Sequence, residues 1–426
     1  MDLQLAKGVR DIPPEEKIVV NRILNTLKTT FERYGFVPLE TPLLERWETF
    51  TAKGGAGEES EALKETFKLK DQGNRELALR FDLTVPLARY VAMNSQLKMP
   101  FKRYEMGPVF RDGPLKLGRY RQFWQCDIDT VGVKGMLVEA EQLALVQDAF
   151  QSLGINIIIK VNNRKLLNGI LEQCGITEKE SAIVALDKLE KIGAKGVTKE
   201  LSDRGYSEEQ TEKLLGMFKE KMTLKEFQKK INSVEGKQGL QELEELFGYL
   251  KNMKVKCAEF EASLARGLGY YTGTVFEVFA VGSAVTSSIA GGGRYDQMVG
   301  KFAGGGRDIP AVGIAFGLST ILDVIKAKQE FKDKSLAKVF VIPIQTITES
   351  LQLVQKLRTK GINADMDLNG RGVGKNLEYA SAMGIPYCAI LGGDELKKNK
   401  VLLRDMLSGD QFLLTLKEVI KKIKIK

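Results

Sequence analysis

The chain of 426 residues contains no histidine. No imidazole is therefore present to act as a general base, to assist a nucleophile or to bind a metal ion. This absence excludes Ser-His-Asp and Cys-His catalysis, and it excludes every zinc site that uses histidine. A reaction carried by this chain must rely on arginine, carboxylate, amide and tyrosine side chains, with Mg²⁺ as a candidate cation.

Other features are also absent. The four cysteines are scattered without a C-x-x-C pair, which indicates neither a disulfide framework nor a zinc site. Charged residues begin at Asp2, and no run approaches the roughly 20 apolar residues of a membrane span. We therefore expect a cytoplasmic protein with reduced thiols, no structural metal and no membrane association.

The composition bounds the class of protein. A length of 426 residues predicts two or three domains, and 43% apolar with 28% charged residues is typical of soluble globular proteins. The net charge of +9 favours a polyanionic partner, although many basic proteins bind no nucleic acid.

Leu264–Phe279, LARGLGYYTGTVFEVF, combines three kinds of residue that suit a binding site. Its three glycines allow a ligand to approach the backbone closely, and Arg266 can hold an anion through two hydrogen bonds. Tyr270 and Tyr271 offer flat surfaces with polar tips. The segment ends in alternating bulky and polar residues, which predict a strand.

A second segment, Phe110–Gly132, holds several arginines and is followed by alternating polar residues. In a strand, Gln125, Asp127 and Asp129 share one face, and such a set is poor core material. An exposed hairpin with satisfied ion pairs is the alternative. Elsewhere, Asp82 and Thr84 can together hold an ammonium group, although D-x-T is also common in turns.

The order of patterns predicts the domains. Residues 1–325 form one domain, interrupted at 177–252 by a charged helical insertion, and 326–338 form a lysine-rich linker. Residues 339–426 alternate strand and helix signals, which predicts a small α/β domain with a mostly parallel sheet. Helices are also expected from residues 11 to 35, 137 to 153 and 311 to 325.

Several segments together resemble the histidyl-tRNA synthetases, a class II family. Leu264–Phe279 and Ala290–Phe302 are similar to its two signature peptides, Phe110–Gly132 to motif 2, and Pro38–Glu45 to motif 1. The C-terminal domain resembles the anticodon-binding domain of these enzymes. The resemblance implies an α+β class II catalytic domain, an antiparallel sheet with flanking helices, carrying a helical insertion and a C-terminal α/β anticodon-binding-type domain.

The same resemblance implies a function. The chain would use ATP, with Mg²⁺, to activate histidine as histidyl-adenylate and would transfer it to tRNA(His). Adenylate formation depends largely on positioning and charge stabilisation, so it needs no imidazole. Motif 1 implies a homodimer. The alternatives are a synthetase-like regulatory subunit that only binds histidine, and a general α/β nucleotide-binding protein, which explains little beyond the C-terminal third.

Residue roles follow from the matched motifs. Arg111 and Arg266 would act on the α-phosphate as catalytic residues, and ATP binding would add Arg119 and Phe123, the latter stacked on adenine. Asp129 would accept a hydrogen bond from the imidazole. The expected histidine-binding residues are Asp82, Thr84, Gln125, Asp129, Tyr270, Tyr271 and Tyr295.

The sequence departs from the family pattern in two places. Thr320 stands where motif 3 normally has an arginine that lies along ATP, and this favours the regulatory alternative. The motif 2 loop, Asp112–Lys116, lacks the acid, arginine and glutamine often found there. Arg294 and Arg307 are the candidates to replace the missing cation.

Overall fold

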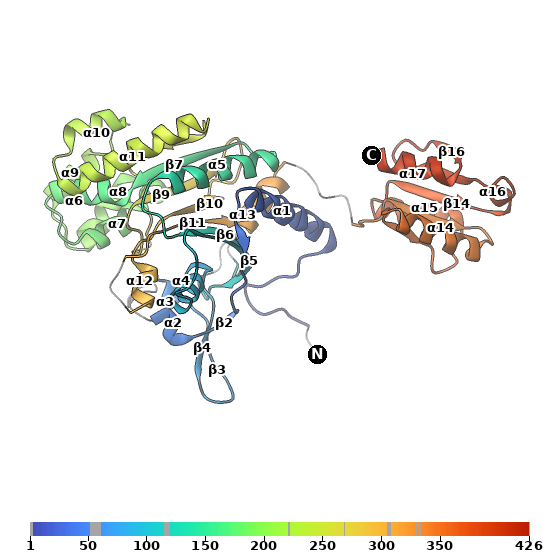
Figure 1. Ribbon diagram of the computed structural model, residues 1–426, viewed down its shortest axis with the longest axis horizontal. Helices are drawn as coiled ribbons and strands as arrows, with labels where there is room; N and C mark the ends of the chain where they lie inside the picture. The colour runs from blue at the N-terminus through green and yellow to red at the C-terminus, as the bar shows by residue number, and fades with distance from the viewer. Residues whose placement is uncertain are drawn as a thin grey trace. The chain divides into compact units, whose positions relative to one another are not determined.

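The computed structural model describes residues 3–425, except 52–60, 115–119, 220–221, 268, 305–307, 329–330 and 332–333. The chain divides into two compact units. The N-terminal unit comprises residues 1–10 and 23–328, and the C-terminal unit comprises residues 11–22 and 329–426. The later division falls within the segment predicted to be a linker (Figure 1).

The N-terminal unit is built on an eight-stranded sheet. Its central strands are antiparallel, as predicted, and only the two edge pairs, β1 with β5 and β7 with β8, are parallel. Across the sheet the strands are β1 (Val37–Pro38), β5 (Phe101–Phe110), β6 (Gln122–Val131), β11 (Ala311–Gly317), β10 (Ala290–Arg294), β9 (Thr274–Ala280), β7 (Ile157–Asn163) and β8 (Ala258–Phe260).

The helix predicted over residues 311–325 is wrong in its first half. Residues Ala311–Gly317 form strand β11, and the helix, α13, covers only Leu318–Lys326. Val312, Ile314 and Phe316 alternate with glycine and alanine, which is a strand period of two. Because β11 pairs with β6 on one side and β10 on the other, its backbone is fully used in the sheet.

Helix α5 (Leu137–Ser152) packs on one face of this sheet, as its predicted helical pattern suggests. Gln142 of α5 donates hydrogen bonds to Thr130 of β6 and to the carbonyl of Val312 in β11. Since neighbouring strand residues point to opposite faces, Asp129 and Gly313 lie on the other face. That second face carries the polar residues singled out in the sequence.

Smaller elements complete the N-terminal unit. A three-stranded sheet has the order β2 (Leu44–Arg46), β4 (Glu76–Leu79), β3 (Lys68–Lys70). Helix α4 (Thr84–Met93) packs against α12 (Met298–Phe302), as Figure 1 shows. The remaining helices here are α1 (Pro14–Arg33), of which residues 23–33 belong to this unit, α2 (Trp47–Thr51), α3 (Glu61–Lys64) and α6 (Arg164–Gln173).

The segment predicted as an insertion is helical in its described residues. Side-chain capping boxes at Ser207 and Thr223 fix two of the helix starts. Helix α11 packs against α5 and α6 (Figure 1). The helices are α7 (Lys179–Leu186), α8 (Leu189–Asp203), α9 (Glu208–Gly216), α10 (Leu224–Lys230) and α11 (Val234–Asn252).

The C-terminal unit contains a five-stranded sheet with helices. The predicted strands exist, but the sheet is mixed rather than mostly parallel, because the last two strands form an antiparallel hairpin. In order, the strands are β13 (Ala364–Met366), β12 (Val339–Pro343), β14 (Tyr387–Leu391), β15 (Val401–Asp405) and β16 (Gln411–Leu414). The helices are α14 (Ile347–Thr359), α15 (Val373–Ala382), α16 (Gly393–Lys397) and α17 (Leu416–Ile425).

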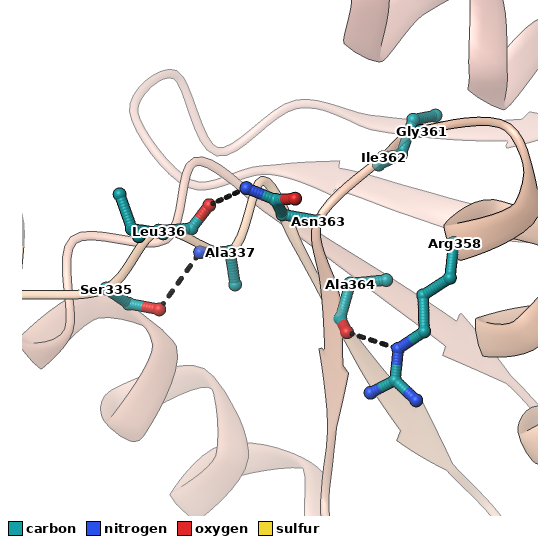
Figure 2. Close-up of a pocket in the computed structure, with 8 residues that line it drawn as sticks. All are labelled: Ser335, Leu336, Ala337, Arg358, Gly361, Ile362, Asn363 and Ala364. Atoms are coloured by element: carbon teal, nitrogen blue, oxygen red, sulfur yellow. Dashed lines mark hydrogen bonds between the residues drawn. The ribbon is translucent and has the colours of Figure 1, made fainter. Parts of the chain in front are cut away.

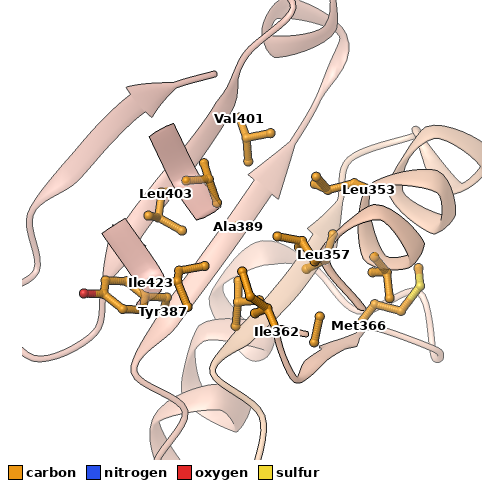
Figure 3. Close-up of a cluster of buried hydrophobic side chains, with 14 of the residues drawn as sticks. Leu353, Leu357, Ile362, Met366, Tyr387, Ala389, Val401, Leu403 and Ile423 are labelled. Atoms are coloured by element: carbon orange, nitrogen blue, oxygen red, sulfur yellow. The ribbon is translucent and has the colours of Figure 1, made fainter. Parts of the chain in front are cut away.

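Apolar side chains cover both faces of this second sheet. Val339, Val341 and Leu403 face one cluster, which Figure 3 shows together with residues of α14 and α17. Phe340 and Ile342, which alternate with them along β12, belong to the cluster on the other face. The C-terminal unit therefore has an ordinary two-sided hydrophobic core.

Candidate active site

Pairing in the N-terminal sheet places the polar residues in rows. Arg103 of β5 lies opposite Asp129 of β6, and Asp129 lies opposite Gly313 of β11. In the next row, Glu105 lies opposite Asp127. These four charged side chains are all at most 2% exposed, so a compact group of ionisable residues is buried in the middle of the sheet.

Small residues beside this group leave room for the longer side chains. A Cβ atom at Gly313 would overlap the carboxylate of Asp129, and one at Gly291 of β10 would overlap the guanidinium of Arg266. A Cβ atom at Gly293 would touch the ring of Tyr271. Gly291, Gly293 and Gly313 thus form a part of the sheet surface without side chains, here called the glycine floor, against which the candidate site residues lie.

Asp129 is held from two sides. Its Oδ2 lies 2.8 Å from Nη2 of Arg103, and the hydroxyl of Tyr295 donates a 2.5 Å hydrogen bond to its Oδ1. Burial raises the pKa of Asp129, although Arg103 and Tyr295 work in the opposite direction. The structure therefore brings together two of the expected histidine-binding residues, Asp129 and Tyr295, and adds Arg103.

Arg80 and Glu105 form a second buried pair, with Nη1 and Oε1 2.8 Å apart. Glu105 also accepts hydrogen bonds from the backbone and hydroxyl of Thr41, and Arg80 donates to the carbonyl oxygens of Thr41 and Pro108. Because these partners come from different elements, the pair braces the sheet beside the site. The sequence interpretation did not include Arg80, Arg103 or Glu105.

Several buried polar atoms on the same face lack hydrogen-bond partners. The Oδ1 atom of Asp127 and the Oε1 atom of Gln125 have no hydrogen bond, and both side chains are at least nine-tenths buried. Burial raises the pKa of Asp127 well above its usual value, against the opposing effect of Arg103. Unpartnered buried polar atoms are rare in folded proteins and indicate a place where a ligand binds.

Asp82 has a structural role in this site. Its Oδ1 accepts hydrogen bonds from the backbone nitrogens of Thr84 and Val85, at 3.1 and 2.9 Å, and so caps the start of α4. Burial raises its pKa, while the bond from Val85 and the charge of Arg111 lower it. The D-x-T pattern therefore positions Asp82, half-buried, near the carboxylates of β6.

Arg111 lies between two aromatic rings. Its guanidinium carbon is 4.2 Å from the ring centre of Phe81 and 5.0 Å from that of Phe123. The ring expected to stack on adenine thus contacts the expected catalytic arginine. Arg119, the other expected ATP-binding cation of motif 2, lies outside the described residues.

Arg266 reaches across β10 from the loop before β9. Its Nη1 donates to the carbonyl oxygen of Phe276 at 3.2 Å and lies 3.6 Å from the carboxylate of Glu277. Burial works against its charge, but Tyr271 and Glu277 outweigh this and raise its pKa. The guanidinium is therefore a permanently charged group placed by a glycine floor.

Three expected tyrosines form an aromatic wall. The ring centres of Tyr270 and Tyr271 are 4.7 Å apart, and those of Tyr270 and Tyr295 are 6.1 Å apart. Burial raises the pKa of each of the three hydroxyls. Neutral phenols at this wall provide flat surfaces against which a small ring can pack.

The two departures from the family pattern have local explanations. The hydroxyl of Thr320 donates to the carbonyl oxygen of Gly317 at 2.8 Å, within the first turn of α13. Arg294 does not replace the missing cation, because its guanidinium makes two hydrogen bonds with Glu139, at 2.7 and 2.8 Å, and is 3% exposed. Arg307, the other candidate, lies outside the described residues.

The C-terminal unit has a separate hollow of about 400 Å³ (Figure 2). Among the described residues that line it, Arg358 is the one that carries a charge, and its Nε donates to the carbonyl oxygen of Ala364 at 3.1 Å. Ser335 and Asn363 supply its other polar side chains. None of the expected histidine or ATP residues lines this hollow.

The described part of the chain contains no cluster of three or more cysteine and carboxylate side chains that could hold a metal ion. No helix among the described residues is both long and apolar enough to cross a membrane.

Comparison with known proteins agrees with this geometry. Residues 8–321 match the histidyl-tRNA synthetase family, and residues 338–426 match the family described as an anticodon binding domain. Histidine--tRNA ligase 1 of Bacillus cereus is 46% identical, over 96% of this chain and 97% of its own length. Histidine--tRNA ligase 2 of Shouchella clausii is 39% identical, over 96% and 97%.

A solved structure extends the match to the fold. The crystal structure of histidyl-tRNA synthetase from Nostoc superposes with a TM-score of 0.88 and 33% identity, covering 100% of this chain and 99% of the other. The matches thus span both units. The chain belongs to the histidyl-tRNA synthetase family.

Proposed function

We propose that this chain activates histidine with ATP and transfers the histidyl group to tRNA(His). The observation that carries the proposal is the buried group formed by Asp129, Arg103 and Tyr295 beside the unpartnered atoms of Gln125 and Asp127. The relatives named histidine--tRNA ligase match nearly the whole chain, which supports the same reaction. The chain is thus an aminoacyl-tRNA ligase.

The amino acid is proposed to bind between β6 and the tyrosines. Asp129 is already fixed by Arg103 and Tyr295, so it can accept the imidazole N–H without first being reoriented. The carbonyl oxygen of Gln125 is free to accept a further hydrogen bond. Asp82 and Thr84 would bind the α-ammonium group, and Tyr270 and Tyr271 would enclose the ring.

Arg111 and Arg266 are proposed to act on the α-phosphate. When the histidine carboxylate attacks phosphorus and pyrophosphate leaves, negative charge is redistributed over the phosphate oxygens. Two guanidiniums held in place before the reaction stabilise that charge without reorganisation. Arg266 is held over Gly291, and Arg111 is held between two phenylalanine rings.

ATP is a substrate in this scheme, with Mg²⁺ bound to its phosphate oxygens. Phe123 is proposed to stack on adenine through the face of its ring that Arg111 does not cover. Arg119 would add a further positive charge. The residues described fit ATP in one respect in particular, because Arg266 and Arg111 supply two guanidiniums already held in place for its phosphates.

The C-terminal unit is proposed to bind the anticodon of tRNA(His). Its match to an anticodon binding domain and the net charge of +9 for the whole chain support this assignment. The hollow beside Arg358 lies in this unit. We propose the domain limits 1–325 and 339–426, with the 177–252 insertion and the 326–338 linker.

A cytoplasmic homodimer is the proposed state of the protein. Three apolar side chains near the motif 1 segment, Val37, Leu43 and Leu44, are 43–50% exposed. Strand β1 pairs only with β5 among the described strands, so its other edge is available for a second copy. Replacing Val37 with glutamate should reduce the mass measured by light scattering to that of a monomer.

One experiment separates this function from the regulatory alternative. Purified protein is incubated with ATP, histidine and tRNA(His), and charged tRNA is measured beside a thermal unfolding assay with histidine. Charging at catalytic protein concentrations supports the ligase. A rise in melting temperature with histidine but no charging would support the regulatory subunit instead, as Thr320 favours.

A further inference from the structure

Asp127 is a buried carboxylate without a role in the site described above. It lies between Gln125 and Asp129 on the same face of β6, is 2% exposed, and its Oδ1 atom has no hydrogen-bond partner. Leaving such an atom unpaired costs stability, so a fold keeps it where a ligand supplies the partner. Asp127 therefore belongs to the site rather than to the core.

The charges around Asp127 show what the missing partner is. Glu105 pairs with Arg80, Asp129 pairs with Arg103, and Asp82 faces the charge of Arg111. Asp127 is the fourth carboxylate and has no cation of its own. The titratable groups near it are Arg103 and Glu105 from β5, Asp129 from β6, Asp82 before α4, and Tyr271. The thiol of the neighbouring Cys126 points to the other face of the sheet.

We propose that Asp127 is a second carboxylate of the ammonium subsite and takes the positive charge of the histidine α-amino group together with Asp82. This inference rests on the proposed function, because it assigns a residue to the same substrate. At neutral pH the α-ammonium is the full positive charge of histidine, whereas the imidazole is mostly neutral. The negative charge of Asp82 is among the causes that raise the pKa of Asp127, so an ammonium group bound near both carboxylates would offset their repulsion.

The proposal has a consequence for protons. Burial raises the pKa of Asp127 in the free protein, so the side chain keeps its proton to a higher pH than an ordinary aspartate. Arrival of an ammonium group favours the ionised form and lowers that pKa. Histidine binding should therefore release a proton from Asp127 in the pH range between the two pKa values.

Calorimetric titration in buffers of different ionisation enthalpy measures this release. Histidine is added to the full-length protein and to Asp127→Asn at pH 5, 6, 7 and 8. The wild type should release a proton fraction that Asp127→Asn lacks, and the variant should bind histidine roughly 10- to 100-fold more weakly. Subtracting one titration from the other cancels the protonation of the imidazole.

Three controls sharpen the result. Asp71→Asn, at the surface ion pair with Arg75, should release protons like the wild type. Asp127→Glu, which keeps the charge, should restore the release. The analogue of histidine without an α-amino group should bind the wild type and Asp127→Asn equally, with no difference in protons.

Two outcomes would overturn the inference in different ways. If the wild type binds histidine and releases no more protons than with the des-amino analogue at any pH, Asp127 does not meet the ammonium group, whatever the variants do. If the wild type binds no histidine at all and does not charge tRNA, the proposed function is wrong, and the assignment of Asp127 is overturned with it.

Discussion

The two large sheets of this protein use their middle strands in opposite ways. In the N-terminal sheet, β5 and β6 bury Arg103, Glu105, Asp127 and Asp129 on one face. In the C-terminal sheet, β12 and β14 contain no charged residue, and apolar side chains cover both faces. Figure 3 shows the cluster on one of these faces. Both sheets are buried, but among their described middle strands only those of the N-terminal sheet bury charged side chains.

This difference in buried charge distinguishes a sheet that carries a binding site from a sheet that serves as structural support. Burying an ionised group is costly unless partners compensate it, and replacing buried ion pairs by apolar side chains is often neutral or stabilising. The C-terminal sheet of the same chain packs apolar side chains on its middle strands and so avoids the cost of burying ionised groups. Charges retained in the N-terminal sheet, one of them without a partner, are therefore best explained by a ligand.

The largest expected effect is a loss of stability in the N-terminal sheet when one of its buried charges is removed. Arg103→Met removes the partner of Asp129 and should lower the free energy of unfolding of the N-terminal unit by about 3–5 kcal/mol. Ile342→Val, in the apolar sheet, should cost only about 0.5–1.5 kcal/mol in the C-terminal unit. Both tryptophans, Trp47 and Trp124, lie in the N-terminal unit, so their fluorescence during urea unfolding follows that unit alone.

Arg103→Met should shift the fluorescence transition, whereas Ile342→Val should leave it in place and shift only the part of the far-ultraviolet circular dichroism signal that comes from the C-terminal unit. A shift for Arg103→Met smaller than that for Ile342→Val would contradict the view that the buried charges depend on one another.

Removal of a catalytic cation is the next effect in size. Arg266→Ala should reduce ATP–pyrophosphate exchange by about 100-fold or more, because a donor to the transition-state anion is lost. Histidine affinity and the melting temperature should change little. Arg371→Ala, in the C-terminal unit, is the matched control and should leave exchange unaltered, since exchange does not require tRNA. Equal rates in the two variants would remove Arg266 from the reaction.

A smaller loss is expected when the glycine floor is filled. Gly291→Ala places a Cβ atom where the guanidinium of Arg266 now lies, so the arginine must move. Exchange should fall by roughly 10-fold or more through misplacement of the charge. Gly248→Ala, on the exposed side of α11 with nothing within 4 Å, should instead raise stability slightly, by about 0.8–1 kcal/mol, with full activity.

The smallest effect concerns pH and stability. Because burial raises the pKa of Asp127 in the folded state, its contribution to stability is fully present below the pKa of the unfolded chain and is lost as pH rises through the folded value. The side chain of Asp127→Asn does not ionise, so the variant does not lose this stability as pH rises. Its melting temperature should exceed that of the wild type by about 1–3 °C at pH 8. The difference in melting temperature should vanish near pH 4. A constant difference at all pH values would show that the ionisation of Asp127 is not its cause.

Local patterns predicted most of the fold because they depend on near neighbours in sequence. The alternation in Gln125, Asp127 and Asp129 correctly predicted a strand, and the helical spacing in residues 137–153 correctly predicted α5. Residues 311–317 were assigned to a helix because the segment resembles motif 3, whereas Val312, Ile314 and Phe316 follow the strand period of two. Pairing with β6 and β10 stabilises these residues as a strand, and this pairing is a long-range contact that local patterns do not reveal.

Only some of the site residues were predicted, because the others depend on long-range contacts in the same way. The pairing of Arg103 with Asp129 was not predicted, because it is set by the register between β5 and β6. The register alone places the two residues opposite each other. Arg103 and Glu105 alternate along β5 and so share one face, which was a signal that sequence reading could have used. The roles assigned to individual site residues stay predictions.

Amino-acid-dependent ATP–pyrophosphate exchange tests the central claim most directly, namely that the charged face of the N-terminal sheet is a histidine-activating site. The purified chain is assayed with histidine and, separately, with each other standard amino acid. We expect exchange with histidine alone, and we expect Asp129→Ala to raise the histidine concentration needed for half-maximal exchange. Exchange that is absent with histidine, or equal with another amino acid, would contradict the account.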